Sequence, residues 1–393
     1  MATLTRFNAR YAQVAARADV TRPSPDVAPP FTVRHLGPNW YAAVMGTAIV
    51  ASAGASLPQR IPGLRTGCTV VWALSVLMLA AVLTARAGHW ARHRDQARDH
   101  LLDPAVAPFY GCFPMALLSV GGATLVVGRD VLGEPAAVAV DAVLFAAGTA
   151  IGLAVTAMIL YLMLVQHRLE PADASPAWIL TVIPLMVASA VGPALVPHLP
   201  AGQAREALLL GCYAMFGLSL LATLTLLPLI FGRLMLHGLL PVALTPLLFI
   251  VLGPLGQSTT AVGQLADVAP TAVDDSSARA LRAFAVVYGV PVTGFALLWL
   301  TLSILLVARA FRHGMRFSMT WWAFTFPIGT CVTAAEGLGR HTGLDAFRWL
   351  AAGLFTLLVL IWAVTWAGTL RGLISGALLA GPGQPRHFSR PRR

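Results

Sequence analysis

Apolar runs of about the length that crosses a lipid bilayer recur along the whole chain. Because an α-helix rises ~1.5 Å per residue, about 20 mostly apolar residues cross the ~30 Å hydrocarbon core. The pattern predicts ten transmembrane helices, at about 39–58, 66–86, 106–127, 137–166, 178–196, 206–231, 241–264, 283–308, 321–336 and 347–370. We therefore expect an all-α integral membrane protein with one ten-helix transmembrane domain over residues 38–371.

Composition supports this class and separates the domain from two tails. Of the 393 residues, 57% are hydrophobic and 11% are charged, whereas soluble domains carry about 25% charged residues. Residues 1–37 and 372–393 are rich in Arg and Pro, and the first tail has no apolar stretch typical of a cleaved signal peptide. The net charge of +11 lies in the tails and between the apolar runs, which favours membrane orientation over nucleic-acid binding.

The arginines divide unevenly between the two sides that ten spans would create. An even number of spans puts both chain ends on one side, and 19 of the 27 arginines fall on that side. Positive charge near spans concentrates on the cytoplasmic face of membranes. We expect a multi-pass protein of the cell (cytoplasmic) membrane with both termini in the cytoplasm.

Helix-breaking residues recur at a nearly constant interval in the odd-numbered spans. Pro114, Pro184, Pro254 and Pro327 are spaced by 70, 70 and 73 residues, and Gly46 precedes the first of them by 68. This period predicts five helical hairpins, in which the odd helix is broken and the even helix is mostly continuous.

Broken helices have a cost inside a membrane. A proline frees a backbone carbonyl, and such groups are tolerated at membrane depth only inside protein or along a wet cavity. We therefore expect the five odd helices to surround a central pore and the five even helices to form an outer sleeve. The alternative is that these prolines only kink packed helices.

Small polar residues accompany the breaks. Hydroxyls and the N-termini of half-helices bind anions without fixed cations, and the segment Gly253–Thr260 combines a break with several polar groups. The predicted pore-lining and helix-break residues are Gly46, Thr47, Pro114, Ser119, Pro184, Pro254, Gly256, Gln257, Thr259, Pro327 and Thr330. The alternative for each hydroxyl is a hydrogen bond to the carbonyl one turn back.

Charged groups offer no catalytic or metal-binding pattern. The ionisable residues near the spans are Asp141, His167, His237, Arg282 and Glu336, all close to span ends, where an interfacial position is expected. The chain has no phosphate-binding loop, no HExxH and no CxxC. We expect no enzyme, no metal and no cofactor, and the lack of a central carboxylate favours channel-like flux over proton coupling.

Aromatic residues precede the break in span nine. Phe324 and Phe326 flank Thr325 just before the proline, where a ring can plug a narrow pore or simply fill the core. Trp321 and Trp322 begin the same span, a position typical of the membrane interface.

Three stretches resemble the tellurite-resistance/dicarboxylate transporter family, which includes slow anion channels, malate permeases and sulfite efflux pumps. They are GPNWYAAVMGTAIV at Gly37–Val50, LGPLGQSTTAVGQL at Leu252–Leu265 and FSMTWWAFTFPIGTCVTA at Phe317–Ala334. With the ten-span layout, the resemblance covers about residues 35–372.

The resemblance implies a homotrimer of subunits, each with five hairpins around a central pore. It also implies a Phe on helix nine that blocks the pore, and Phe326 matches it, with Phe324 the match if the alignment shifts by two places. The implied function is transport of small anions: C4-dicarboxylate, sulfite, tellurite-like or halide. The alternatives from the residues are a membrane-embedded redox or cofactor-binding protein and a receptor or scaffold.

Overall fold

The computed structural model describes residues 36–59 and 61–379, and its regular secondary structure over those ranges is entirely helical. Seven helical stretches there are long and apolar enough to cross a membrane: Leu64–Arg92, Ala107–Leu132, Glu134–Val165, Gln203–Leu236, Val242–Thr271, Asp275–Arg312 and Asp345–Ile374. These stretches agree with the expected all-α membrane protein.

The other three predicted spans coincide with shorter helices. Spans one and five contain Tyr41–Ser56 and Ile183–Val191, and span nine overlaps Thr325–Thr342, which continues six residues beyond it. The ten-span topology stays a prediction. The predicted tails, 1–37 and 372–393, lie outside the described residues apart from 36–37 and 372–379.

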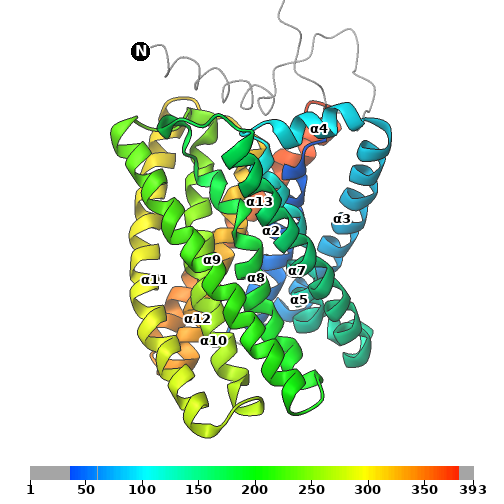
Figure 1. Ribbon diagram of the computed structural model, residues 1–393, viewed down its shortest axis with the longest axis vertical. Coiled ribbons are helices and arrows are strands. Elements are labelled where there is room, and N and C mark those ends of the chain that lie inside the picture. Colours follow the sequence, from blue (N-terminus) through cyan, green and yellow to red (C-terminus); the bar gives the residue numbers. More distant parts are fainter. Residues whose placement is uncertain (1–35, 60, 380–393) are drawn as a thin grey trace, which may run out of the picture.

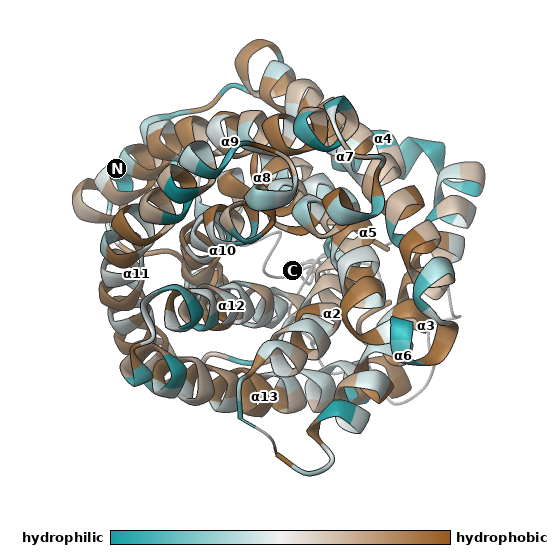
Figure 2. Ribbon diagram, turned by 90° about the horizontal axis from the view of Figure 1, so that it is seen from below, coloured by the Kyte–Doolittle hydropathy of each residue, from teal (hydrophilic) through white to brown (hydrophobic). Residues whose placement is uncertain are grey.

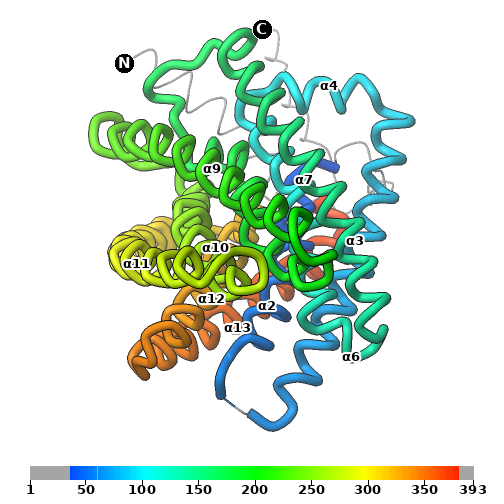
Figure 3. Tube along the Cα trace, turned by 60° about the horizontal axis from the view of Figure 1, so that its bottom comes forward, coloured from blue at the N-terminus to red at the C-terminus, as the bar shows by residue number. Residues whose placement is uncertain are grey.

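The helices form two concentric layers (Figure 2). The inner layer holds α2 (Tyr41–Ser56), α5 (Cys112–Ala123), α8 (Ile183–Val191), α10 (Leu252–Val268) and α12 (Thr325–Thr342). The outer layer holds α3 (Leu64–Arg92), α7 (Glu134–Val165), α9 (Gln203–Leu236), α11 (Asp275–Arg312) and α13 (Asp345–Ile374). Each inner helix packs against the outer helix that follows it, and α2 contacts both α5 and α12, which closes the ring (Figure 3).

Burial differs sharply between the layers. In the inner stretch Ala107–Leu132, 89% of the residues in its apolar 18-residue window are buried. In the corresponding window of the outer helix α9, only 22% are buried. The outer helices turn large apolar side chains outward; Leu164 and Leu236, for example, are more than 80% exposed. Such a surface is stable against lipid tails but not against water.

All five inner helices follow a 3₁₀ segment: α2 follows the short η1 (Pro38–Trp40), and the other four follow segments that each lead to a proline in the first turn of the α-helix. These four segments are η2 (Ala107–Gly111), η5 (Pro176–Thr181), η7 (Val242–Val251) and η9 (Met319–Phe324). Pro114, Pro184, Pro254 and Pro327 are the second or third residues of α5, α8, α10 and α12. A proline in the first turn has no N–H that needs a partner within the helix, so it starts an α-helix without loss of a hydrogen bond.

Gly46 behaves differently from the four prolines. It lies inside the continuous helix α2, so no break occurs there. A Cβ at this position would collide with Thr325 of α12, and the glycine therefore allows α2 and α12 to approach closely.

Shorter elements complete the fold. They are η1 (Pro38–Trp40), α4 (Arg94–Leu102), the π-helix η3 (Thr124–Gly128), α6 (Arg129–Leu132), η4 (Pro171–Asp173), η6 (Gly192–His198) and η8 (Ala269–Thr271). The polar helix α4 lies across the end of the molecule from which the inner helices start (Figure 1).

The start of α11 shows ordinary capping. The Asp274 carboxylate accepts hydrogen bonds from the backbone N–H groups of Ser276 and Ser277 and from their hydroxyls, which holds its pKa below the usual range.

Candidate functional site

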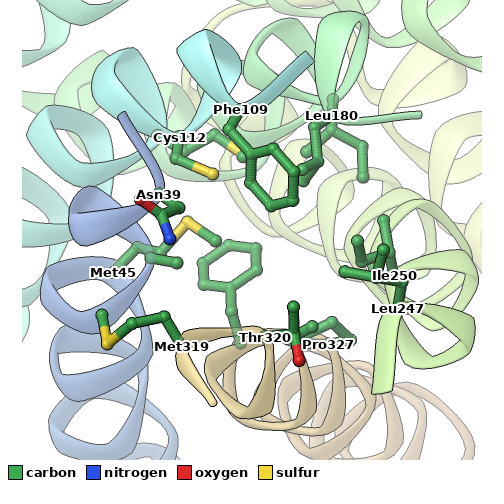
Figure 4. A pocket seen from close by; sticks show the side chains of 16 residues that line it. Asn39, Met45, Phe109, Cys112, Leu180, Leu247, Ile250, Met319, Thr320 and Pro327 are labelled. Carbon is green, nitrogen blue, oxygen red and sulfur yellow. The ribbon is translucent and has the colours of Figure 1, made fainter. Parts of the chain in front are cut away.

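Two cavities lie along the inner ring, and the same five inner segments line both. The first, called the N-side cavity, is lined by residues near the N-terminal ends of these segments and has a volume of about 30 Å³. Figure 4 shows its largely apolar lining, in which Met45, Phe109, Leu180, Ile250 and Met319 surround a common space. Its apolar walls offer an ion little replacement for water.

The second, called the C-side cavity, is lined further along the same helices and has a volume of about 130 Å³. Its lining includes eight polar side chains: Ser52, Ser56, Ser119, Gln257, Thr260, Gln264, Thr333 and Glu336. Within each helix these residues are spaced by three, four or seven positions, which places them on one helical face. This cavity offers the hydrogen-bonding groups that the N-side cavity lacks.

Phe326 is the residue that lines both cavities. It is the second residue of α12, directly before Pro327, and only 3% of its surface is exposed. The backbone changes from 3₁₀ to α geometry just before it, between Phe324 and Thr325. The ring therefore stands at the boundary between an apolar space and a polar one.

Phe324 lies two residues earlier but in a different environment. Its ring packs edge-on against Phe249, with ring centroids 4.8 Å apart, and against Trp321 at 5.9 Å. It lines neither cavity. The structure thus separates two phenylalanines that the sequence left as alternatives.

The predicted site residues fall into two groups. Ser119, Gln257, Phe326 and Pro327 line one or both cavities. The others, Gly46, Thr47, Pro114, Pro184, Pro254, Gly256, Phe324, Thr259 and Thr330, line neither.

Several residues of the second group serve packing between helices. The Thr47 hydroxyl donates to the Ala43 carbonyl at 2.8 Å and accepts from the Trp362 indole of α13 at 3.2 Å. The Thr330 hydroxyl donates to the Pro327 carbonyl at 2.7 Å. Both hydroxyls thus donate to a backbone carbonyl three or four residues back in the chain, which is the alternative to a pore-lining role.

Glu336 was expected at the membrane interface, but the structure places it in the wall of the C-side cavity with 5% exposure. Its Oε2 accepts a hydrogen bond from Arg340, one turn later on α12. Arg340 also donates to Asp267 of α10 at 3.0 Å, and His341 contacts the same aspartate at 2.7 Å. A small charged network therefore borders the polar cavity.

Two further residues that were expected near the interface are buried inside the protein. Asp141 belongs to α7, is 1% exposed and faces Gly121 of α5, so it is buried in the protein. Trp322 is fully buried, and its indole N–H donates to the Thr369 hydroxyl of α13 at 3.0 Å. In both cases helix packing, which the linear sequence does not show, removed the side chain from the surface.

The described residues contain no group of three His, Cys, Asp or Glu side chains arranged to hold a metal ion. The four cysteines are buried and unpaired. The prominent feature of this part of the chain is thus the pair of cavities divided by one aromatic ring.

A family model described as "voltage-dependent anion channel" matches residues 35–370, which is most of the chain. The chain belongs to this family. The match confirms the resemblance drawn from the three sequence stretches. The family description supports transport of anions across a membrane as the general function of this protein.

Relatives in the family carry transporter names. The chain is 27% identical to the sulfite efflux pump of Trichophyton rubrum, over 86% of this chain and 91% of that protein. It is 26% identical to the sulfite efflux pump of Arthroderma otae, with the same coverage. An uncharacterized transporter of Methanocaldococcus jannaschii is 25% identical over 89% of this chain and 96% of its own length.

Several of the polar residues that line the C-side cavity follow a helical spacing in the sequence, although most of them are not among the predicted site residues. Ser52 and Ser56 are four residues apart, and Gln257, Thr260 and Gln264 follow a spacing of three and four. A search for polar residues on one helical face of the inner spans would have selected these positions and Glu336, which lies three residues after Thr333.

Proposed function

We propose that this protein conducts small anions along the axis of the inner ring, through the N-side and C-side cavities, with Phe326 as the gate. The observation that carries the proposal is the position of Phe326 in the lining of both cavities. A ring at that boundary closes a continuous path, and its displacement opens one.

The polar cavity supports anions as the permeating species. It contains hydroxyl and amide groups from α2, α5, α10 and α12, and such groups replace part of the hydration shell of an anion without trapping it by a fixed cation. The candidate substrates are sulfite, C4-dicarboxylates, tellurite-like oxyanions and halides, and the names of the fungal relatives favour sulfite among them.

The proposed setting is the cytoplasmic membrane, with both termini in the cytoplasm. The excess of arginine on the side of the chain ends supports this orientation, and the N-side cavity would then face the cytoplasm. The proposed assembly is a homotrimer in which each subunit has ten spans and its own pore; the family resemblance supports it.

Thiol modification tests the proposed path. Ser52 lines the C-side cavity, so we expect a charged, membrane-impermeant methanethiosulfonate to reduce anion flux in the Ser52→Cys variant, because the attached group fills the cavity. Flux of nitrate and sulfite through proteoliposomes at fixed voltage is the measurement. The native cysteines are all buried, and Cys112, which lines the N-side cavity, is replaced by Ala in both this variant and its control so that the background stays low.

The matched control is Thr271→Cys. Thr271 follows α10, is exposed and lies outside the C-side cavity, so its modification is expected to leave flux unchanged. Equal inhibition of both variants, or no inhibition of a fully labelled Ser52→Cys, would place the path elsewhere.

A further inference from the structure

The C-side cavity contains two polar groups whose hydrogen-bonding capacity is unused. Ser119 Oγ and Gln257 Oε1 have no hydrogen-bond partner among the described residues, although the two side chains are 6% and 4% exposed. Both line the cavity, from α5 and from α10. An unpaired buried polar group costs about 1–3 kcal/mol, so these groups indicate a site that is completed by water or by a ligand.

The other hydroxyls of this cavity have already used their hydrogens. Ser52 donates to the Ala48 carbonyl at 3.0 Å, and Ser56 donates to the Ala53 carbonyl at 2.9 Å. Thr333 donates to the Thr330 carbonyl at 3.0 Å, and the Thr260 hydroxyl bonds to Thr333 Oγ1 at 2.8 Å and to the Gly256 carbonyl at 3.0 Å. These four side chains therefore present lone pairs, rather than O–H donors, to the cavity.

Glu336 adds further acceptors. Its Oε2 accepts a hydrogen bond from Arg340, while Oε1 accepts none from the described residues. The charged groups nearest to it are Arg340 and His341 of α12 and Asp267 of α10; on α13, Arg348 is bonded to Asp345. The carboxylate is thus anchored in place while it borders the cavity.

The balance of the lining is unusual for an anion site. Free donors come from the Ser119 hydroxyl and the Gln257 amide, whichever way the amide is turned, whereas acceptors come from four hydroxyl oxygens and a carboxylate. A bare dianion has only acceptor oxygens, so it would face unpaired lone pairs and a like charge. A ligand with acceptor oxygens and its own O–H would satisfy both kinds of group.

We propose that the C-side cavity is a selectivity site for oxyanions in their singly protonated, monovalent form, with Ser119 and Gln257 as donors and Glu336 as the residue that excludes dianions. The inference rests on the proposed anion conduction and specifies the form of the substrate. Candidate ligands of this class are the monoanions of sulfite and of C4-dicarboxylic acids.

The first test measures anion flux through the wild-type protein in proteoliposomes at clamped voltage. Sulfite flux is measured on either side of the pH of its second ionisation, and nitrate, which keeps one charge throughout, is the reference. We expect the sulfite-to-nitrate ratio to follow the singly protonated fraction and sulfate to pass poorly. The ratio cancels any titration of the protein that changes the flux of both anions equally.

The variant Glu336→Gln tests the role of the carboxylate. Arg340 keeps Asp267 as a partner in this variant, so the fold is expected to persist. Removal of the like charge should raise the flux of sulfate relative to nitrate by about tenfold. The control Asp267→Asn removes the same charge from the same network, but Asp267 does not line the cavity, so the sulfate-to-nitrate ratio should stay near that of the wild type.

The outcomes separate the two proposals. A sulfite-to-nitrate ratio that ignores protonation, or equal changes in Glu336→Gln and Asp267→Asn, would overturn the selectivity site while anion conduction stands. Absence of flux for every anion, including nitrate, in a folded protein would overturn the proposed function and the selectivity site with it.

Discussion

Replacement of Phe326 by Ala is expected to raise basal anion conductance by about tenfold or more. The ring borders both cavities and is almost fully buried, and burial of a Phe side chain is worth about 1.5–3 kcal/mol. If that energy holds the path closed, its loss shifts the balance between closed and open states by a factor of ten to a hundred. Anion current or flux at clamped voltage is the measurement.

Phe324→Ala is the matched control for this experiment. Phe324 is about as buried as Phe326 and lies on the same short segment, but it packs on Phe249 and lines neither cavity. Each substitution is expected to lower the free energy of unfolding by about 3–5 kcal/mol. The folded fraction of the two variants must therefore be measured and compared. Conductance that rises equally in both, or in neither, would show that Phe326 is not the gate.

Replacement of Gly256 by Ala is expected to destabilise the protein by about 1–3 kcal/mol, the usual cost of overpacking a core. A Cβ at this position would lie 2.5 Å from the Thr330 hydroxyl, 2.6 Å from the Thr330 carbonyl carbon and 2.7 Å from the Cys331 amide nitrogen. Because two of these atoms are backbone, α10 and α12 must move apart. Thermal unfolding of the detergent-solubilised protein is the measurement.

Gly263→Ala is the control on the same helix. The nearest atom to a Cβ there is the His341 ring carbon Cε1 at 3.7 Å, which is an ordinary contact. The substitution should therefore be neutral or stabilise the helix by roughly 0.5–1 kcal/mol, since Gly is a poorer helix former than Ala. Similar unfolding temperatures for the two variants would contradict the close approach of α10 and α12.

Gly256 and Thr259 contact neighbouring helices and do not line either cavity. Their place in the Gly253–Thr260 cluster suggested a role in lining the pore, but Gly256 meets the α12 backbone and Thr259 meets Gly289 of α11. A bulky residue at Gly256 is now expected to disturb helix packing first. Gln257, between these two residues, is the member of the predicted set from this cluster that reaches the C-side cavity.

The sequence by itself determined the class of protein and the positions at which four of its inner helices change geometry. Apolar runs of spanning length require a bilayer, and the three family-like stretches by themselves place the chain among anion channels and transporters. The four prolines mark the transition from 3₁₀ to α geometry in four inner helices, because a proline fixes its own backbone wherever the helix packs. The same local rule placed Phe326 directly before Pro327.

Only the tertiary structure decided which faces of the inner helices line the cavities. These helices are mostly apolar and buried, and each of α2, α10 and α12 carries polar residues on more than one face, so polarity in the sequence alone does not show how each helix is rotated about its axis. The rotation is set by contacts between segments far apart in the chain, such as Gly256 against Thr330 and Gly46 against Thr325. Those contacts accompany the rotation that turns Gln257 and Glu336 toward the cavity and Thr47 and Thr259 toward neighbouring helices. Close packing of backbones selects the rotation that small residues permit.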